Sequence, residues 1–407
     1  MRLQRKYQFI FIIIASLMLC LGCVEEFEPK INDFADFLVV EATISNEMKH
    51  QTIYLNRTFT FEDETAAPET NAQVRVIDDA SNEYAFSESS PGTYTSLVPF
   101  QAQANMNYQL KIAMSNGSTY SSDNTSLPTG SALDSLYAER IVTDTGEEGM
   151  GIFIDNFDDQ GQAKNYRYEY VETYKVVAPD WNAIGLENIP QPVCPRTVKV
   201  DRTRDERICY GTRVSNEIIL ASTESFDENR LSKFMVRFVN RDNYVLSHRY
   251  SILVRQHVQS NDAFSFYDRL KEFSSSESIF SETQPGFLEG NLHSDTAREN
   301  NVLGYFNVTS VSEKRIFFDY DDFFPGEELP PYADPCQRSK PKVAAGHGPE
   351  PRCILASLVD LDLIRYVVDN EDYIGPQSDG GPFYVVPRVC GDCTVLGETK
   401  VPEFWIE

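Results

Sequence analysis

The chain has 407 residues, and its 62 Asp and Glu outnumber its 36 Lys and Arg, which gives a formal net charge of −26. An acidic surface repels phosphate backbones, so the charge argues against nucleic acid as a partner. The length accommodates two or three domains, and the abundance of Tyr (21) and Phe (26), with frequent Val, Ile and Thr, favours a mostly β fold.

Residues 1–22 have the pattern of a secretion signal. Three basic residues precede an apolar run at residues 9–21, which fits a signal peptide and is shorter than the roughly 20 residues that a membrane-spanning helix needs. The run ends at Gly22-Cys23 and resembles a lipobox, although Cys20 stands where Leu is commonest. We expect cleavage before Cys23 and a covalent lipid on its sulfur. The alternative is an ordinary signal peptide with a cysteine near the cut.

A polar tether is expected at residues 23–36, and it begins with an acidic cluster. The cluster consists of Glu25, Glu26, Phe27 and Glu28. It resembles the surface-export signal of Bacteroidetes lipoproteins, which implies an outer-membrane location with the protein facing the cell exterior. The anchor's partner would be outer-membrane lipid, because each buried lipid methylene contributes about 0.8 kcal/mol. A solvated acidic linker is the alternative.

Residues 37–128 contain a series of short strand patterns with turn residues between them. The patterns lie at 37–44, 51–56, 72–76, 108–114 and 119–122, with one more beginning at Tyr94. We expect seven short strands in all, with turns at roughly 8- to 12-residue intervals, and this number and spacing predict an immunoglobulin-like β-sandwich.

A larger β-rich domain is predicted at residues 136–407, after a linker at 126–135 that contains Pro and Gly. Its apolar segments 234–239 and 250–254 predict two core strands that pair with each other. The fold class is therefore mostly β, with an N-terminal sandwich followed by a second β-rich domain.

One main helix is expected near residues 262–274. Apolar residues recur there at spacings of three and four, which places them on one helix face. These residues are Ala263, Phe266, Leu270 and Phe273. Asn261 or Asp262 is expected to cap the helix, because a short side chain accepts from the free N–H groups of the first turn.

Six cysteines besides Cys20 and Cys23 predict disulfides, as in an exported chain. They are Cys194, Cys209, Cys336, Cys353, Cys390 and Cys393. Six cysteines allow 15 pairings, and the sequence does not select one. Pairing of neighbours, Cys194–Cys209 and Cys336–Cys353, is the simplest arrangement, because each bridge would close a short loop worth about 3 kcal/mol.

The Cys390-x-x-Cys393 motif admits three interpretations. A structural disulfide is the simplest. A redox pair normally requires a βαβ context, which the pattern lacks. A zinc site requires four ligands, so Cys336 and Cys353, or His347, would have to complete it.

No pattern specific to a catalytic site occurs. The five histidines are scattered, and the sequence has no His-Glu-x-x-His motif, no Gly-x-Ser-x-Gly elbow and no phosphate-binding glycine loop. The acidic clusters at 155–159 and 319–322 fit solvated turns or incidental calcium sites, but not a twelve-residue calcium loop. Tyr166, Tyr168 and Tyr170 either pack on a sheet face or stack on a ligand. We therefore expect no enzyme, no catalytic residue, no resident metal and no cofactor beyond the lipid.

The order of several segments resembles the domain-of-unknown-function 4249 family of Bacteroidetes lipoproteins. The segments are 37–44, the helix around 266–273, Pro285-Gly286-Phe287-Leu288-Glu289-Gly290-Asn291, Val302-Leu303-Gly304-Tyr305-Phe306, Cys390-Gly391-Asp392-Cys393 and Phe404-Trp405. The resemblance implies a cell-surface lipoprotein, often encoded beside a TonB-dependent outer-membrane transporter, and therefore a partner β-barrel.

The leading hypothesis is a non-enzymatic surface lipoprotein that captures cargo for such a transporter or caps it. An accessory lipoprotein of an outer-membrane assembly or export machine is the alternative. A surface hydrolase, which would need a pocket with two carboxylates or a bound metal, is the third hypothesis.

Overall fold

The structure is a computed structural model, and it describes residues 37–58, 66–275, 288–296, 302–346, 351–375 and 378–407. Cys23, the acidic cluster at 25–28 and His347 lie outside these residues. The predicted lipid attachment and surface-export signal are therefore still predictions. Within the described residues, no helix is long and apolar enough to span a bilayer.

The mostly β class is confirmed. The strands are β1 (Leu38–Ser45), β2 (Thr52–Arg57), β3 (Gln73–Asp78), β4 (Glu83–Ser90), β5 (Thr93–Ser96), β6 (Asn107–Ala113), β7 (Thr119–Ser122), β8 (Thr125–Ser126), β9 (Ser135–Val142), β10 (Glu148–Phe157), β11 (Asn165–Val177), β12 (Ile184–Ile189), β13 (Arg196–Asp201), β14 (Ile208–Val214), β15 (Ile219–Ser222), β16 (Arg230–Asn240), β17 (Tyr250–Gln259), β18 (Leu292–Ser294), β19 (Val302–Phe318), β20 (Ile364–Asp369) and β21 (Phe383–Pro387). The helices are η1 (Tyr244–Leu246), α2 (Asn261–Ser275), α3 (Tyr320–Phe323), α4 (Ile354–Asp360), α5 (Arg388–Gly391) and η2 (Cys393–Val395).

The first seven strands form an immunoglobulin-like sandwich, which we call the first sandwich. One layer has the order β1-β2-β5-β4 and the other the order β3-β6-β7, as in the ABED and CFG sheets of an immunoglobulin constant domain. The β3–β4 hairpin joins the two layers by hydrogen bonds. Alternating side chains of both layers, including Leu55, Val76 and Leu110, fill a common buried core.

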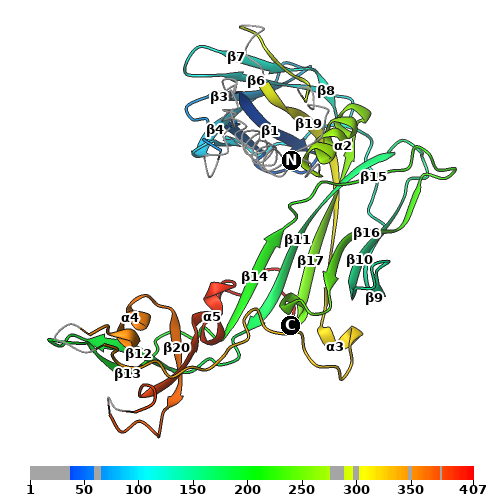
Figure 1. Cartoon of the computed structure of the whole chain (residues 1–407). Helices are drawn as coiled ribbons and strands as arrows, with labels where there is room; N and C mark the ends of the chain where they lie inside the picture. Colours follow the sequence, from blue (N-terminus) through cyan, green and yellow to red (C-terminus); the bar gives the residue numbers. More distant parts are fainter. Residues whose placement is uncertain (1–36, 59–65, 276–287, 297–301, 347–350, 376–377) are drawn as a thin grey trace, which may run out of the picture.

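Two strands of the first sandwich come from much later in the chain. β18 pairs with β7, and the first half of β19 runs parallel to β1 over Val302–Thr309. The second half of β19 pairs with β17 instead. One continuous strand therefore crosses from the first sandwich into the next part of the molecule (Figure 1).

The second part is another sandwich, which we call the second sandwich. The sheet β14-β11-β17-β19 faces the sheet β16-β10-β9 across a large apolar core. The predicted pairing of segments 234–239 and 250–254 is wrong, because β16 pairs with β10 and β17 pairs with β11 and β19. Both segments are core strands, but Val236 and Val254 approach the core from opposite sheets.

The helix α2 lies where the apolar spacing predicts it, but its cap differs. The cap is Ser260, whose Oγ accepts the backbone N–H of Ala263 at 3.1 Å. It lies one residue before Asn261, the first of the two expected caps. Ala263 and Phe266 are buried, whereas Phe273 is 36 % exposed. The apolar face is therefore buried mainly in the first two turns, where Phe266 packs on Tyr305 of β19 at a ring distance of 5.2 Å.

A third part, which we call the lobe, is assembled from residues 180–207 and 333–395. It contains the hairpin β12–β13, the helix α4 and the hairpin β20–β21, and lies at the end of the molecule farthest from the first sandwich (Figure 1). Neither β12 nor β13 has a buried residue. A two-stranded hairpin without a core is marginally stable in water, so the lobe requires another source of stability.

Candidate functional site: the disulfide-linked lobe

Three disulfides hold the lobe together and attach it to the second sandwich. All six predicted cysteines take part, in the pairs Cys194–Cys353, Cys209–Cys393 and Cys336–Cys390, with Cα separations of 5.4, 5.6 and 5.6 Å. The first bridge ties the β12–β13 loop to the start of α4, and the other two tie the C-terminal segment down. Small folds with little core commonly depend on such cross-links.

The predicted neighbour pairing, Cys194–Cys209 and Cys336–Cys353, is wrong. The strand β13, six extended residues with a length of about 20 Å at about 3.3 Å each, runs away from Cys194 before the chain turns into β14, which holds Cys209. A disulfide requires Cα atoms within roughly 7 Å. Closing a short loop by a disulfide has only a small entropic advantage over closing a long one, because each doubling of loop length costs about 0.6 kcal/mol. The geometry of the strands therefore decides the connectivity.

The Cys390-x-x-Cys393 motif is structural in this fold. Its two cysteines are bonded to different partners, so they do not form a redox pair with each other. Ligand atoms of Asp334, Cys336 and Cys390 lie within 4.8 Å of one another. However, both sulfurs belong to one disulfide and cannot act as thiolate ligands.

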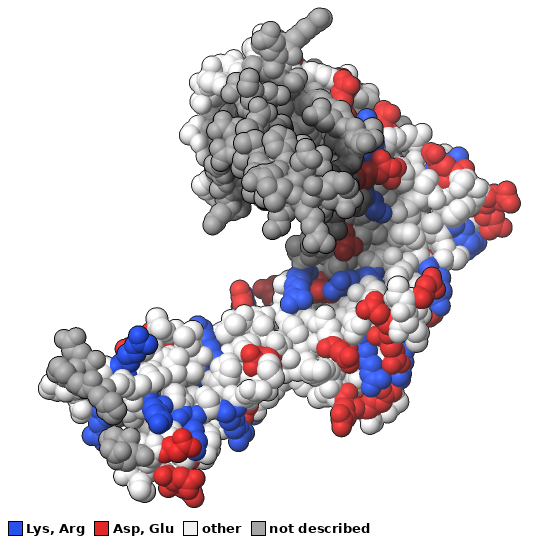
Figure 2. Space-filling view, viewed as in Figure 1, with Lys and Arg blue, Asp and Glu red and all other residues white. Residues whose placement is uncertain are grey.

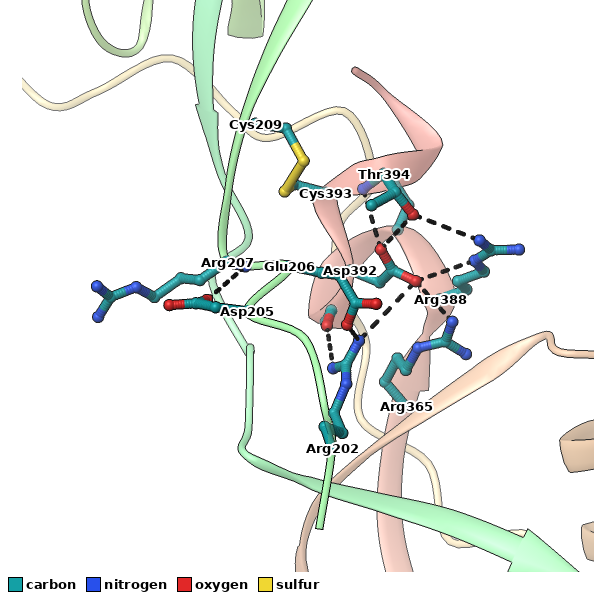
Figure 3. Close-up of a disulfide and its surroundings, with 12 residues drawn as sticks. Arg202, Asp205, Glu206, Arg207, Cys209, Arg365, Arg388, Asp392, Cys393 and Thr394 are labelled. Atoms are coloured by element: carbon teal, nitrogen blue, oxygen red, sulfur yellow. Dashed lines mark hydrogen bonds and ion pairs between the residues drawn. A yellow bond between two sulfur atoms is a disulfide. The ribbon is translucent and has the colours of Figure 1, made fainter. Parts of the chain in front are cut away.

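The residue between these cysteines, Asp392, is the centre of an ionic network (Figure 3). Its carboxylate is 3 % exposed and accepts from Arg365 Nη2 at 2.6 Å and Arg388 Nε at 3.2 Å. It also accepts the backbone N–H of Thr394 at 3.0 Å and the hydroxyl of Thr394 at 2.5 Å. The network therefore connects β20 and α5 to η2 through one buried carboxylate.

A second layer of this network reaches the β13–β14 connection. Arg202 pairs with Glu206 and donates from Nη1 to the carbonyl oxygen of Gly391 at 2.8 Å (Figure 3). A Cβ on Gly391 would lie 2.6 Å from Cβ of Arg365. Glycine is therefore required for the close approach of α5 to β20, and the network joins both segments of the lobe.

The charges around Asp392 fix its ionisation. Burial by itself would raise its pKa, but the hydrogen bonds from Thr394 and the charge of Arg365 outweigh burial and lower the pKa from 3.8 to about 2. Asp362 and Asp392 raise the pKa of Arg365 in turn, against the opposing effect of burial. Asp392 and Arg365 are therefore both charged at neutral pH.

A small cavity of about 270 Å³ opens beside this network, between the β12–β13 hairpin and β20. Its charged walls include Arg202, Glu206, Asp362 and Arg365, which are paired with one another or with Asp392. Drug-sized ligands usually occupy about 300–1,000 Å³. The cavity can accommodate one side chain. The four charged groups named above already form the ion pairs that hold the lobe together.

The other predicted candidates have structural roles in the described residues. Tyr166, Tyr168 and Tyr170 are buried in the core of the second sandwich, so they pack on a sheet face. In the acidic cluster at 155–159, Asp158 accepts the N–H groups of residues 162 and 163, each at 2.7 Å. In the cluster at 319–322, the first and last residues form the capping box of α3. The first cluster therefore stabilises a turn, and the second caps a short helix.

Four of the five histidines lie in the described residues, far apart in the fold. His50 Nδ1 lies 2.7 Å from the carbonyl oxygen of Ser96, and His293 pairs with Asp123 at 3.0 Å. His257 is buried on β17, and burial lowers its pKa. None of these histidines joins a group of potential metal ligands in the described residues.

Sequence reasoning missed Asp392, Arg202 and Arg365 as the residues that assemble the lobe. Asp392 was visible inside the Cys390-x-x-Cys393 motif, but Arg202 and Arg365 are separated from it by long stretches of chain. The one local signal was the spacing of Asp392 and Thr394, two residues apart, because an Asp side chain often accepts the backbone N–H two residues later.

Comparisons with known proteins bear on most of the chain. A sequence model of one family, described as "Domain of unknown function (DUF4249)", matches residues 24–315. A comparison with curated proteins finds no match. The matched region covers both sandwiches up to three residues before the end of β19, and the second segment of the lobe lies beyond it.

Proposed function

Because the chain belongs to the domain-of-unknown-function 4249 family, we propose that it is a non-enzymatic outer-membrane lipoprotein. It is anchored by lipid on Cys23, faces the cell exterior and works with a TonB-dependent transporter, whose cargo it captures or whose barrel it caps. The lipobox-like Gly22-Cys23 and the acidic cluster at 25–28 support the anchor and its location. The partner barrel is inferred from the family resemblance.

The three disulfides support a location outside the cytoplasm. All six cysteines of residues 194–393 are bonded in pairs. Such bonds persist in oxidising compartments and are rare in the cytosol, where thiols are kept reduced. The chemistry of these cysteines therefore agrees with an exported protein.

The observation that carries a binding function is the rigid presentation of the lobe. The lobe has little core of its own, yet two disulfides and the Asp392 network hold it together, and the Cys209–Cys393 disulfide attaches it to β14 of the second sandwich. A surface that is ordered before binding loses less conformational entropy when a partner docks. This arrangement suits a protein that presents a fixed surface to another macromolecule.

Affinity purification after gentle detergent extraction from native membranes tests the proposal. We expect a large TonB-dependent barrel to be recovered in stoichiometric amounts. Recovery of the lipoprotein alone, under conditions that keep known surface complexes intact, would contradict a stable partner. Recovery of an assembly or export factor would favour the accessory-subunit alternative, and hydrolysis of surface glycans or peptides by the pure protein would favour the hydrolase alternative.

A further inference from the structure

Three stretches of the lobe contain basic residues and no acidic residue. They span residues 188–200, 335–346 and 351–359, and together they carry six Lys and Arg. In a chain with 62 Asp and Glu, this local composition is unusual. These three stretches are therefore locally basic in a chain that is acidic as a whole.

The three acid-free stretches meet in space. The Cys194–Cys353 disulfide joins the first stretch to the third. Residues 345 and 352 form a two-way backbone bridge, and the N–H of Leu355 donates to the carbonyl oxygen of Lys342 at 3.2 Å. The second and third stretches are therefore neighbours too, and the three form one surface at the end of the lobe.

Three of the six basic side chains are neutralised by acidic residues from elsewhere. Lys199 pairs with Asp369 at 2.6 Å and Arg338 pairs with Asp180 at 2.7 Å, while Lys340 lies 3.7 Å from Asp379.

Arg196, Lys342 and Arg352 differ from these three. Each is exposed, and none has an ion pair within the described part of the chain. Figure 2 shows several basic side chains on the lobe, with acidic side chains also present at its lower end, and side chains of both signs on the second sandwich. Among the described residues, these three side chains are therefore the cations of the three stretches that carry no ion pair.

Exposed apolar side chains accompany these cations. Ile189 is 49 % exposed and Val193 is 64 % exposed. The first and third stretches contain four prolines near the Cys194–Cys353 disulfide, at positions 190, 192, 195 and 351. Because proline fixes φ, this surface loses little backbone freedom on binding. We call Ile189, Val193, Arg196, Lys342 and Arg352 the basic tip.

We propose that the basic tip is the docking surface for an acidic segment of the partner protein. This inference rests on the proposed function and identifies the contact surface. An acidic segment is attracted by the tip and repelled by the rest of the molecule, so charge selects the tip over other surfaces. An extended anionic lipid surface is disfavoured, because it would also face the acidic body of the protein, whose net charge is −26.

Charge reversal on the full-length, membrane-extracted protein tests the inference. The variant Arg196→Glu/Lys342→Glu/Arg352→Glu is compared with Lys164→Glu/Lys271→Glu/Lys400→Glu, which changes the net charge equally at exposed positions away from the tip. We expect the tip variant to reduce recovery of the barrel about tenfold or more, whereas the control retains it. Equal recovery with both variants would overturn the inference but preserve the proposed function. Failure of the unaltered protein to recover any barrel would overturn the proposed function itself.

A photo-crosslinking amino acid in place of Val193 identifies the occupant. We expect cross-linked peptides from an acidic segment of the barrel, identified by mass spectrometry. Cross-links to neutral or basic segments, or to lipid only, would overturn the inference. Binding of the protein to vesicles of anionic phosphatidylglycerol is compared with binding to vesicles of zwitterionic phosphatidylcholine. Binding to the anionic vesicles alone that is lost in the tip variant would overturn the inference and assign the tip to lipid.

Discussion

Asp392 shows how one buried carboxylate can organise a region that has little core. It accepts from Arg365 and Arg388, and from both the backbone and the side chain of Thr394. A buried ion pair is costly to form, because both charges lose water. Removing one partner is costlier still, since the remaining charges are left buried and unpaired. The network therefore makes the packing of the two lobe segments against each other specific.

We expect Asp392→Asn to destabilise the lobe by about 3 kcal/mol, since Arg365 and Arg388 lose their shared partner. Hydrogen exchange of amides in α5 and β20 measures this loss locally. Asp379→Asn is the matched control, because Asp379 is 96 % exposed and lies 3.7 Å from Lys340, and we expect a change within about 0.5 kcal/mol. Equal effects of the two substitutions would contradict the role of Asp392.

The pKa of Asp392 predicts a specific acid sensitivity. Its pKa is about 2 in the folded protein and 3.8 ordinarily. Ionised Asp392 therefore stabilises the fold fully above pH 3.8, and this contribution is lost as the pH falls through about 2. The stability difference between the unaltered protein and Asp392→Asn should narrow over this interval in acid titrations followed by circular dichroism. A difference that does not change with pH would refute the assignment.

The strand β19 is the element that connects the two sandwiches. Its residue Gly304 has φ +120° and pairs with Val40 of β1, where an added Cβ would lie 1.9 Å from the carbonyl oxygen of Val40. The carbonyl oxygen of Gly304 lies equally close to where a Cβ of Gly290 would be, at 1.8 Å. Two glycines therefore allow three backbone segments to come together where the strand enters the first sandwich.

We expect Gly304→Ala to destabilise the first sandwich by about 3 kcal/mol or more, because both backbone strain and a clash with β1 oppose the methyl group. Gly117→Ala is the control, since Gly117 also has a positive φ (+89°) but no atom lies within 4 Å of its added Cβ. It should cost about 1–2 kcal/mol, from strain alone. Denaturant unfolding of both variants measures the difference, and equal losses would show that the clash is relieved elsewhere.

The disulfide Cys194–Cys353 should act on the lobe alone. We expect the double variant Cys194→Ser/Cys353→Ser to lower the stability of the lobe by about 3 kcal/mol, because the β12–β13 hairpin has no buried residue to compensate. Hydrogen exchange should accelerate in β12 and β13 and stay unchanged in β1–β7, which serve as an internal control. Loss of protection throughout the chain would contradict the independence of the lobe.

Local elements could be predicted from the sequence because their signals are local. Alternation gave the strands of the first sandwich except β4, which has only one buried residue, and the spacing of Ala263, Phe266 and Leu270 gave α2. Partners distant in sequence could not be predicted. Residues 234–239 and 250–254 are both core strands, yet nothing in their composition indicates that they lie in different sheets. The disulfide pairing was missed for the same reason, since strand geometry determines it.

At the scale of the whole molecule, three parts lie in sequence from the first sandwich to the lobe (Figure 1). The continuous strand β19 joins the two sandwiches, and the Cys209–Cys393 disulfide joins the lobe to the second sandwich. The proposed anchor precedes the first sandwich, so the basic tip is presented at the opposite end of the molecule. This arrangement fits a tethered protein whose far end meets a partner.

The proposed anchor is the premise on which this arrangement depends. Mass spectrometry of the N-terminal peptide from natively produced protein tests it most directly. We expect the mature chain to begin at Cys23, with a diacylglyceryl group on its sulfur and an acyl group on its amine. An intact leader, or a mature N-terminus without lipid, would contradict the account.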